Sequence, residues 1–581
     1  MILQALNQYY NRLVENGELE RPGWELVNVS YALQIDDDGE LVRVLPQEAE
    51  VVRGKKTVKL PKQINVPAQV KRSVDISPNF LCDNSTYIIG IDAKGKPDRS
   101  IKCFEASREK HCEWLKNSIS KPAKAVTNFF IKWDPKKAAE NPVLEPYLES
   151  IQKGGNLIFD YNGEFVQNCP EIQNIWNERY QDHSDNDEMI CLVTGKKASI
   201  ARIHPSIKGI YGGQTSGVSL VSFNKPSFES YGFDGKQGLN APVSEEAAFG
   251  YTSALKFMVN NAGKNWRIGD TTTVFWSESG RDEYSDYADF MLGGDVPSGE
   301  TDDTIYQRLK DLSLGRKVIF DQGSLMPDEK FYILGLEPNA ARLSVKYFIS
   351  NEFGVFVKNV LEHHERLEIV RPNYDQKQYL SFWNIFNETV NPKSKDKSPS
   401  PVLVAAVVRA VLQGLPYPAL LYDQIQLRIR ADRIVNRTRA SIIKAYLIRN
   451  IANNNKKLKE VVTVELNENT TYQPYLFGRL FAVLEALQSA ANPGINTTIR
   501  DRYFNSACST PAVVFPQLLK LAQAHLKKVN QGTAVYYNKL ICTIMEGIHS
   551  EFPARLSLYD QGVFQLGYYH QFQKRFEKKE D

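Results

Sequence analysis

Residues 391–401, with the sequence NPKSKDKSPSP, separate two regions of different character. Because this segment contains three prolines and no residue suited to a core, it is typical of a linker. Beyond it, stretches such as YLFGRLFAVLEALQSAA (475–491) have apolar residues at helical spacing. Before it, β-type runs alternate with glycine turns and helices. We therefore predict an α+β region over 1–390 and a helical bundle over 402–581.

The N-terminal region opens with hairpin patterns. The stretch WELVNVSYALQIDDDGELVRVLP (24–46) predicts strands joined by a turn at Asp38 and Gly39. TYIIGIDAKGKPD (86–98) predicts a second strand–turn–strand, and CFEASREKHCEWLKNSI (103–119) predicts an amphipathic helix. These patterns indicate an α+β fold that begins with β-hairpins.

The acidic turn admits a second interpretation. Asp36, Asp37 and Asp38 stand side by side, with Glu40 two positions on. A stand-alone metal-dependent nuclease could use such carboxylates, and this function stays open as an alternative. We favour the solvated turn, because two-metal nucleases gather their carboxylates from separate elements.

Composition excludes several classes of protein. The chain of 581 residues is 42% hydrophobic and 24% charged, so it can bury cores and is not a disordered segment. No apolar run approaches the roughly 18 residues of a membrane helix, and the N-terminus has no basic leader, so we expect a cytoplasmic protein. Seven cysteines form no C-x-x-C pair, which argues against a disulfide framework and a zinc ribbon.

No convincing reaction centre is present. The sequence lacks G-x-S-x-G, H-E-x-x-H and the zinc-deaminase pattern. His363 and His364 are neighbours in LEHHERLE (361–368), and adjacent helical residues face different ways, so we expect a helix surface there instead of a zinc site. We expect no enzymatic activity, no cofactor and no metal.

A glycine-rich stretch, HPSIKGIYGGQTSGVSLVSFN (204–224), invites comparison with phosphate-binding loops. Gly212, Gly217 and Ser219 have the spacing of the Walker pattern, but Val218 stands where its lysine should be. Because that lysine contacts the outer phosphates of the nucleotide, its absence argues against a nucleoside triphosphatase. Two interpretations remain: a hairpin between strands, or a loop whose backbone closely approaches a polyanion or a groove.

Basic charge is concentrated in one segment. Residues 401–460 contain eleven Lys or Arg against three acidic residues, a balance of 11 − 3 = +8. Arg430, Arg433, Arg437 and Lys444 are spaced by three, four and seven, so a continuous helix would carry them as one stripe. We predict that this stripe contacts a nucleic-acid backbone. The alternative is a solvated helix face.

Several stretches together resemble one known family. The similarity runs from the first residue almost to the last, in the same order, and points to the large subunit of the type I-C CRISPR surveillance complex, Cascade, of the Csd type. The stretches that carry it are MILQALNQYYNRL (1–13), KRSVDISPNFLCDNSTYIIGID (71–92), CLVTGKKASIARIHPSIKGIYGGQTSGVSLVSFN (191–224), FESYGFDGKQGLNAPVSEEAAFGYTSAL (228–255), FYILGLEPNAARLSV (331–345) and LYDQGVFQLGYYHQ (558–571).

The resemblance implies a non-catalytic role in DNA recognition. Members of the family lie beside crRNA-bound backbone and crRNA-processing subunits, read the protospacer-adjacent motif of target double-stranded DNA, help to open the duplex and recruit a separate helicase–nuclease. Guide pairing then reads the target sequence. A purely structural scaffold subunit is a further alternative. No membrane partner is implied.

Two stretches are the candidates for motif recognition. In KRSVDISPNFLCDN (71–84), Lys71 and Arg72 could contact phosphates or guanine edges, and Asn79 and Asn84 could pair with a base; alternatively, these asparagines cap turns. In the glycine-rich stretch, we expect the following residues to approach the duplex, with the glutamine at the tip acting as a wedge: Lys208, Gly212, Gly213 and Gln214.

The resemblance also implies small subunits made by internal translation of the same gene. Residues from about 461 to 581 would form this product. The chain has no methionine between Met326 and Met545, so such a product would have to start at a GUG codon, with Val461, Val462 and Val464 as candidates.

Overall fold

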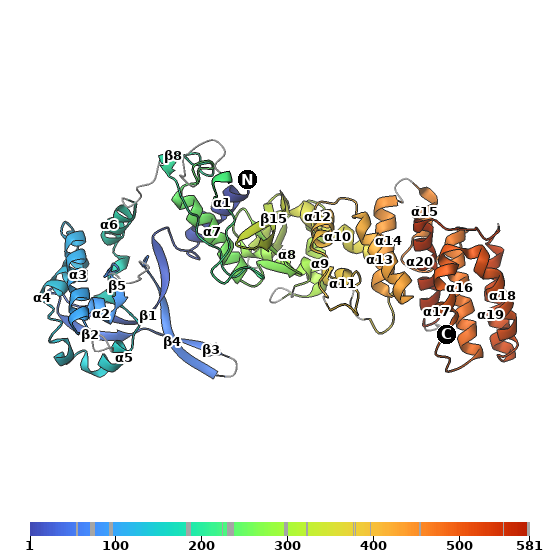
Figure 1. Cartoon of the computed structure of the whole chain (residues 1–581), viewed down its shortest axis with the longest axis horizontal. Coiled ribbons are helices and arrows are strands. Elements are labelled where there is room, and N and C mark those ends of the chain that lie inside the picture. Colours follow the sequence, from blue (N-terminus) through green and yellow to red (C-terminus); the bar gives the residue numbers. More distant parts are fainter. Residues whose placement is uncertain are drawn as a thin grey trace. The chain divides into compact units, whose positions relative to one another are not determined.

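The structure is a computed structural model of the chain. It describes residues 1–53, 56–69, 76–91, 97–181, 188–223, 225–228, 238–294, 300–320, 323–375, 377, 379–395, 397–451, 455–549 and 551–577. The chain divides into two compact units (Figure 1). We call residues 10–204 and 223–250 the N-terminal unit, and residues 1–9, 205–222 and 251–581 the C-terminal unit.

The predicted fold class is confirmed: strands and helices mix in the N-terminal part of the chain, and the C-terminal part is helical. The predicted linker at 391–401 lies within the C-terminal unit, and the functional division there stays a prediction. Over the residues that the structure describes, no helix is both long and apolar enough to cross a membrane.

The N-terminal unit contains most of the chain's strands. Helices α1 (Ile2–Glu15) and α7 (Glu245–Asn260) belong partly to each unit. The strands of this unit are β1 (Trp24–Ile35), β2 (Leu41–Pro46), β3 (Glu48–Arg53), β4 (Lys56–Pro67), β5 (Cys82–Asn84), β6 (Asn156–Tyr161), β7 (Glu164–Phe165), β8 (Glu188–Ile190) and β9 (Lys197–Ser199). Its helices are α2 (Ser85–Ile88), α3 (Pro97–Leu115), α4 (Lys121–Lys132), η1 (Ala138–Glu140), η2 (Glu145–Tyr147), α5 (Leu148–Gln152), η3 (Val166–Asn168), α6 (Pro170–Gln181) and η4 (Pro226–Phe228).

Seven of these strands form one sheet. The order is β3-β4-β1-β6-β5, with β2 paired to β1 and β7 paired to β6. Strands β1 and β6 are parallel, with Ala32 opposite Ile158, and the other pairs are antiparallel. Phe129 and Phe130 of α4 both contact Phe159 of β6 edge to face, so α4 packs its aromatic face on the sheet.

The predicted hairpin turn at Asp38 and Gly39 is confirmed, since Ile35 of β1 pairs with Leu41 of β2. Gly39 has a φ of +79°, and a Cβ there would lie 2.3 Å from the backbone nitrogen of Phe129. Only glycine meets both conditions. The helix predicted over 103–119 is also present, as α3.

The strand predicted near the start of 86–98 is wrong. Residues 85–88 form the short helix α2, because the Asn84 side chain accepts a hydrogen bond from Thr86 N (3.1 Å) and caps its first turn. Residues 92–96 of the predicted hairpin lie outside the described residues, and α3 begins at Pro97.

The C-terminal unit starts from a sheet and continues into helices. Its strands are β10 (Asn265–Ile268), β11 (Thr271–Ser277), β12 (Val318–Phe320), β13 (Gly323–Leu325), β14 (Lys330–Asn339) and β15 (Arg342–Glu352). Its helices are α8 (Asp282–Leu292), α9 (Asp302–Ser313), α10 (Phe353–Leu367), α11 (Phe382–Asn387), α12 (Pro401–Leu412), α13 (Ala419–Asp432), α14 (Arg437–Tyr446), the π-helical η5 (Leu447–Ile451), α15 (Lys456–Val461), α16 (Gln473–Ala491), α17 (Ile499–Ser509), α18 (Pro511–Leu526), α19 (Gln531–Glu546) and α20 (Leu558–Lys574).

A continuous core joins the sheet of this unit to its helices. Strands β10, β11, β14 and β15 form an antiparallel sheet in that order. One cluster of buried apolar side chains extends from Ile268 in β10 to Tyr569 in α20. The predicted linker, between α11 and α12, therefore does not separate two cores, because the apolar residues on both sides of it belong to this one cluster.

The helical bundle surrounds α16 (Figure 1). Helices α17, α18, α19 and α20 all pack against α16, and every residue from Pro474 to Leu487 is buried. The sequence predicted one apolar face for this helix. The structure buries it on all sides, including Arg479 and Glu485, whose charges are satisfied by hydrogen bonds from within the bundle.

The histidine pair of α10 is not on a helix surface, so that expectation is wrong. His363 is only 1% exposed, and its Nδ1 lies 2.6 Å from the Tyr417 hydroxyl. His364 packs against the ring of Tyr379. His363 is buried and His364 is half-buried, because other helices of the unit pack against α10, which its own sequence does not reveal.

Candidate nucleic-acid interface

The glycine-rich stretch forms a hairpin in the C-terminal unit. Ile207 and Val218 exchange two backbone hydrogen bonds of 2.8 Å and close the loop. The side chains of Ile207, Ile210 and Val218 are buried and fix the base of the hairpin. Ser219 then pairs with the edge of β15, where Leu343 N donates to Ser219 O at 2.9 Å. The loop is thus mounted on a rigid sheet.

Two glycines are required by this geometry. Gly209 has a φ of +95°, and a Cβ there would lie 2.5 Å from Asn260 Oδ1. Gly217 has a φ of +100° and packs against Ser206. Both therefore serve the tight turns of the hairpin. Gly212 and Gly213 lie at the outer end, where Gly212 also has a positive φ of +72°.

The outer end of the hairpin is exposed, and two cations lie near the loop. Lys208 and Gln214 are exposed, and Lys208 forms no ion pair with any residue that the structure describes. Arg267 of β10 lies over the ring of Tyr211, and both side chains are exposed. The hairpin, together with Arg267 of β10, therefore presents an amide tip and two cations at a surface open to solvent.

Sequence reasoning did not find Arg267 and Tyr211. Arg267 lies on a strand more than forty residues downstream, so no local pattern links it to the loop. An aromatic residue directly before Gly212 and Gly213 was the one signal that could have pointed to Tyr211. An arginine placed over a tyrosine ring is suited to contact phosphates or base faces.

The second candidate stretch lies in the N-terminal unit. Lys71 and Arg72 lie outside the described residues. Asn79 is 4% exposed, and its backbone N–H donates to Asp83 Oδ2 at 2.9 Å. Asn84 uses its side chain as a helix cap. In the form described, the two asparagines have the turn-capping and core roles that were the alternative to base recognition, and base recognition by them stays a prediction.

His111 holds this segment in place. Its Nε2 accepts a hydrogen bond from Leu81 N (2.9 Å), and its Nδ1 donates to Ser107 O (2.7 Å). Burial lowers the pKa of His111 to about 3, so the ring stays neutral and keeps this tautomer at neutral pH. Leu81 has a positive φ of 59°, a strained conformation that this hydrogen bond helps to maintain.

The basic stripe is not one helix, so the predicted geometry is wrong. Helix α13 ends at Asp432, and Arg433 is in the left-handed conformation with a φ of +58°. Asn436 then caps the new helix α14, because its side chain accepts a hydrogen bond from Arg439 N. Two short helices replace the continuous helix on which the spacing argument depended.

The four cations of the stripe fall into two classes. Arg430 and Arg433 are exposed, and Arg430 Nη2 donates to Gln561 Oε1 at 2.9 Å. Arg437 is buried, and its Nη1 lies 2.9 Å from Asp375 Oδ2. Lys444 is 2% exposed and donates to the Arg366 carbonyl at 3.0 Å. Burial lowers the pKa of Lys444 to about 8.

The acidic turn is likewise occupied by structural contacts. Asp36 Oδ1 accepts hydrogen bonds from Asp38 N (3.0 Å) and Glu40 N (2.9 Å). Asp37 accepts one from the Tyr161 hydroxyl, and Asp38 lies 3.7 Å from Lys132 Nζ. Within the described ranges, no three His, Cys, Asp or Glu side chains are grouped so that they could hold a metal ion.

Comparison with known proteins identifies the family. The family described as CRISPR-associated protein (Cas_Csd1) matches residues 6–576. The chain belongs to the Cas_Csd1 family. The match covers both compact units, so neither is an addition to the family's own architecture. A search of curated proteins found no match. Membership of Cas_Csd1 confirms the family resemblance seen in the sequence and implies a place in a Cascade-type complex.

The two classes of cation in this Cas_Csd1 chain have different expected mutant effects. Arg433→Ala should reduce by about one the slope of log binding constant against log salt, because an exposed cation that meets a phosphate releases one counterion. Lys444→Ala should instead lower the thermal stability by about 1–3 kcal/mol, since it leaves buried carbonyls without a donor. Duplex DNA binding measured across a series of salt concentrations checks the Arg433→Ala prediction. Thermal melting checks the Lys444→Ala prediction, and both measurements are made on both variants. A changed salt slope with unchanged melting in Lys444→Ala would contradict this division.

Proposed function

We propose that this chain is the non-catalytic large subunit of a type I-C CRISPR effector complex. In this role it recognises the protospacer-adjacent motif on double-stranded DNA, aids duplex opening and R-loop formation, and recruits the helicase–nuclease. Membership of the Cas_Csd1 family supports the setting. The observation that carries the DNA-recognition role is the exposed hairpin of residues 207–218, with Gln214 at its outer end and the exposed Lys208 next to its base.

The chemistry of the hairpin suits a duplex. A glycine-rich tip has little bulk, so its backbone can approach a groove closely. The Gln214 amide offers both a donor and an acceptor to base edges, and Lys208 and Arg267 offer charge to the phosphates. The base of the hairpin is buried, and Ser219 next to it pairs with β15. This anchoring positions the tip so that it can act as a wedge between base pairs.

The proposed partners follow from the same setting: crRNA-bound backbone subunits, a crRNA-processing subunit and small subunits from the same gene. The packing of α16 supports an independent small subunit, because helices α17 to α20, which pack against it, all lie downstream of residue 461. Helix α20 also packs against α14, so such a product would expose that face of α20. A second product beginning near Val461, found by intact-mass analysis of complex from the native gene, would support it; a complex without such a product would exclude it.

The test of motif recognition is Gln214→Ala in the assembled complex. We expect binding of a motif-bearing duplex to weaken by about 1–3 kcal/mol, with slower strand opening, because the tip loses its contact with the bases. Binding of a guide-complementary single strand should not change. The motif is identified by binding the complex to target duplexes with randomised flanking bases and sequencing the duplexes before and after selection. The same selection with the Gln214→Ala complex shows whether the preference for the motif is lost.

Thr215→Ala is the matched control, since Thr215 is the exposed neighbour of Gln214. Equal losses on the duplex and the single strand would mean that the hairpin has no part in motif reading.

A further inference from the structure

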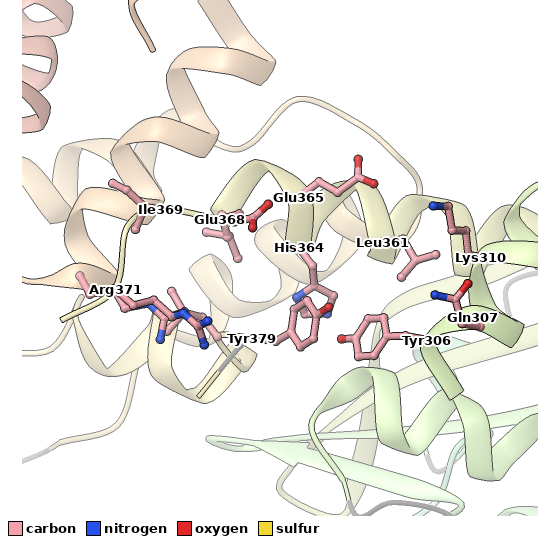
Figure 2. Close-up of a pocket in the computed structure, with 13 residues that line it drawn as sticks. Tyr306, Gln307, Lys310, Leu361, His364, Glu365, Glu368, Ile369, Arg371 and Tyr379 are labelled. Carbon is pink, nitrogen blue, oxygen red and sulfur yellow. The ribbon is translucent and has the colours of Figure 1, made fainter. Parts of the chain in front are cut away.

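A pocket of about 310 Å³ lies in the C-terminal unit, between α9, α10 and residues 369, 371, 379 and 380 (Figure 2). This volume is at the lower end of the roughly 300–1,000 Å³ of small-ligand sites. It shares no residue with the hairpin. The pocket is lined by Tyr306, Gln307, Lys310, Leu361, His364, Glu365, Leu367, Glu368, Ile369, Arg371, Tyr379, Leu380 and Arg437.

An aromatic pair forms one wall of the pocket. The rings of Tyr306 and Tyr379 are stacked, with centroids 4.2 Å apart and planes 18° from parallel. Phe290 packs edge-on against Tyr306, and His364 packs edge-on against Tyr379. Because these rings come from four different segments, the platform is held rigidly without a ligand.

Charged groups surround this platform. Figure 2 shows Arg371 and Lys310 on opposite sides of the tyrosine pair, with Glu365 and Glu368 on the α10 side. Lys310 and Arg371 are both exposed, whereas the charge of Arg437 is already paired with Asp375. The two exposed cations can therefore meet separate anionic groups at the two ends of a ligand.

His364 contributes a polar group in neutral form. Burial lowers the pKa of His364 to about 4. Its Nδ1 is buried, and no described residue hydrogen-bonds to it. A buried nitrogen of this kind is costly unless a ligand or water satisfies it.

We propose that this pocket binds one unstacked nucleotide of a single nucleic-acid strand. The base stacks on the Tyr306–Tyr379 wall, and the phosphates on its two sides contact Lys310 and Arg371. Single-strand sites combine aromatic stacking with cations that follow the backbone. A free mononucleotide would use only one of the two cations. Glu365 and Glu368 accept hydrogen bonds from base N–H groups and disfavour an anion in the centre.

The first test is binding of fluorescein-labelled ten-nucleotide DNA and RNA strands to the purified full chain. Tyr379→Ala should weaken binding by roughly 5- to 100-fold, and Tyr379→Phe should retain it because the ring remains. Tyr374→Ala is the matched control, since Tyr374 belongs to the same segment and is 87% exposed. Lys310→Ala and Arg371→Ala should each reduce the salt slope by about one.

The second test locates the base. Strands carrying 5-iodouracil should crosslink on irradiation to Tyr306 or Tyr379, as mapped by peptide mass spectrometry. A purely structural role of these tyrosines would produce no such crosslink. Comparing the labelled DNA strand with the labelled RNA strand shows which type of nucleic acid the pocket binds. The strands carry no motif, so failure of motif recognition leaves this test intact.

Three outcomes would overturn the proposal: unchanged affinity in Tyr379→Ala, crosslinks confined to other parts of the chain, or saturable binding of nucleoside monophosphates without binding of a strand.

Discussion

Gly478→Ala is expected to disrupt the helical bundle. A Cβ at Gly478 would lie 1.9 Å from Phe564 O and 2.7 Å from Tyr568 N, both backbone atoms of α20. Gly567 of α20 also lies close to the backbone of α16, since a Cβ there would be 2.2 Å from Tyr475 O. Two glycines thus let α16 and α20 pack backbone against backbone. A methyl group there has no side chain to displace, so the helices themselves must separate.

Overpacking usually costs about 1–3 kcal/mol and occasionally more, and this contact lies at the centre of the bundle. Replacing glycine by alanine within a helix stabilises the helix by only about 0.5–1 kcal/mol, which does not offset this cost. We therefore expect a large fall in the melting temperature of the full chain, or an insoluble product. Circular dichroism and differential scanning calorimetry would measure it.

Two further variants keep this expectation testable if Gly478→Ala fails to fold. Gly532→Ala is the control, because this glycine of α19 is exposed and a Cβ there meets only Asn530 Oδ1 at 3.6 Å; it should be neutral or stabilising. Gly562→Ala would meet the Tyr422 hydroxyl at 2.1 Å, so its damage should be partly relieved by Tyr422→Phe. A Gly478→Ala chain that melts like the unaltered protein would refute the close approach.

Acidification from pH 7 to pH 5 is expected to destabilise the protein strongly. Burial lowers the pKa of His111 and His570 to about 3, and lowers that of His363 well below its usual value. Their stabilising contribution is complete above the unfolded pKa of about 6.5 and is lost as the pH falls toward the folded pKa, because the unfolded chain takes up the protons first. Each histidine should cost about 2 kcal/mol at pH 5.

Between pH 5 and pH 7 the stability depends on the buried histidines and not on the ion-paired aspartates. The Arg437 and Arg439 side chains lower the pKa of Asp375 and Asp432 respectively, against the opposing effect of burial, so these carboxylates keep their charge at pH 5. Their contribution is lost only at lower pH. Melting temperature measured at several pH values between 5 and 7 checks the expectation.

His111→Gln should lower the melting temperature at pH 7 and make it less dependent on pH. His549→Gln, at an exposed position, is the control and should leave the pH dependence unchanged. If the protein melts at the same temperature at pH 5 and pH 7, the buried histidines are not neutral in the way that the structure implies.

The sequence by itself determined the α+β class, the turn at Asp38 and Gly39, the helix over 103–119, the helical C-terminal part and the family. These features depend on local periodicity, turn chemistry and the order of distinctive stretches, all of which can be read along the chain. The glycine-rich hairpin was also accessible, because positive-φ turns impose their own residue types.

Only the tertiary structure decided which polar groups are buried. Charge spacing placed Arg430, Arg433, Arg437 and Lys444 on one stripe, yet the left-handed residue Arg433 ends the first helix, and Asp375 and the Arg366 carbonyl engage the other two cations. The pocket likewise assembles from Tyr306, His364 and Tyr379, which come from three separate segments of the chain. Partners from distant segments set burial and pairing, and a single sequence without its packing does not specify them.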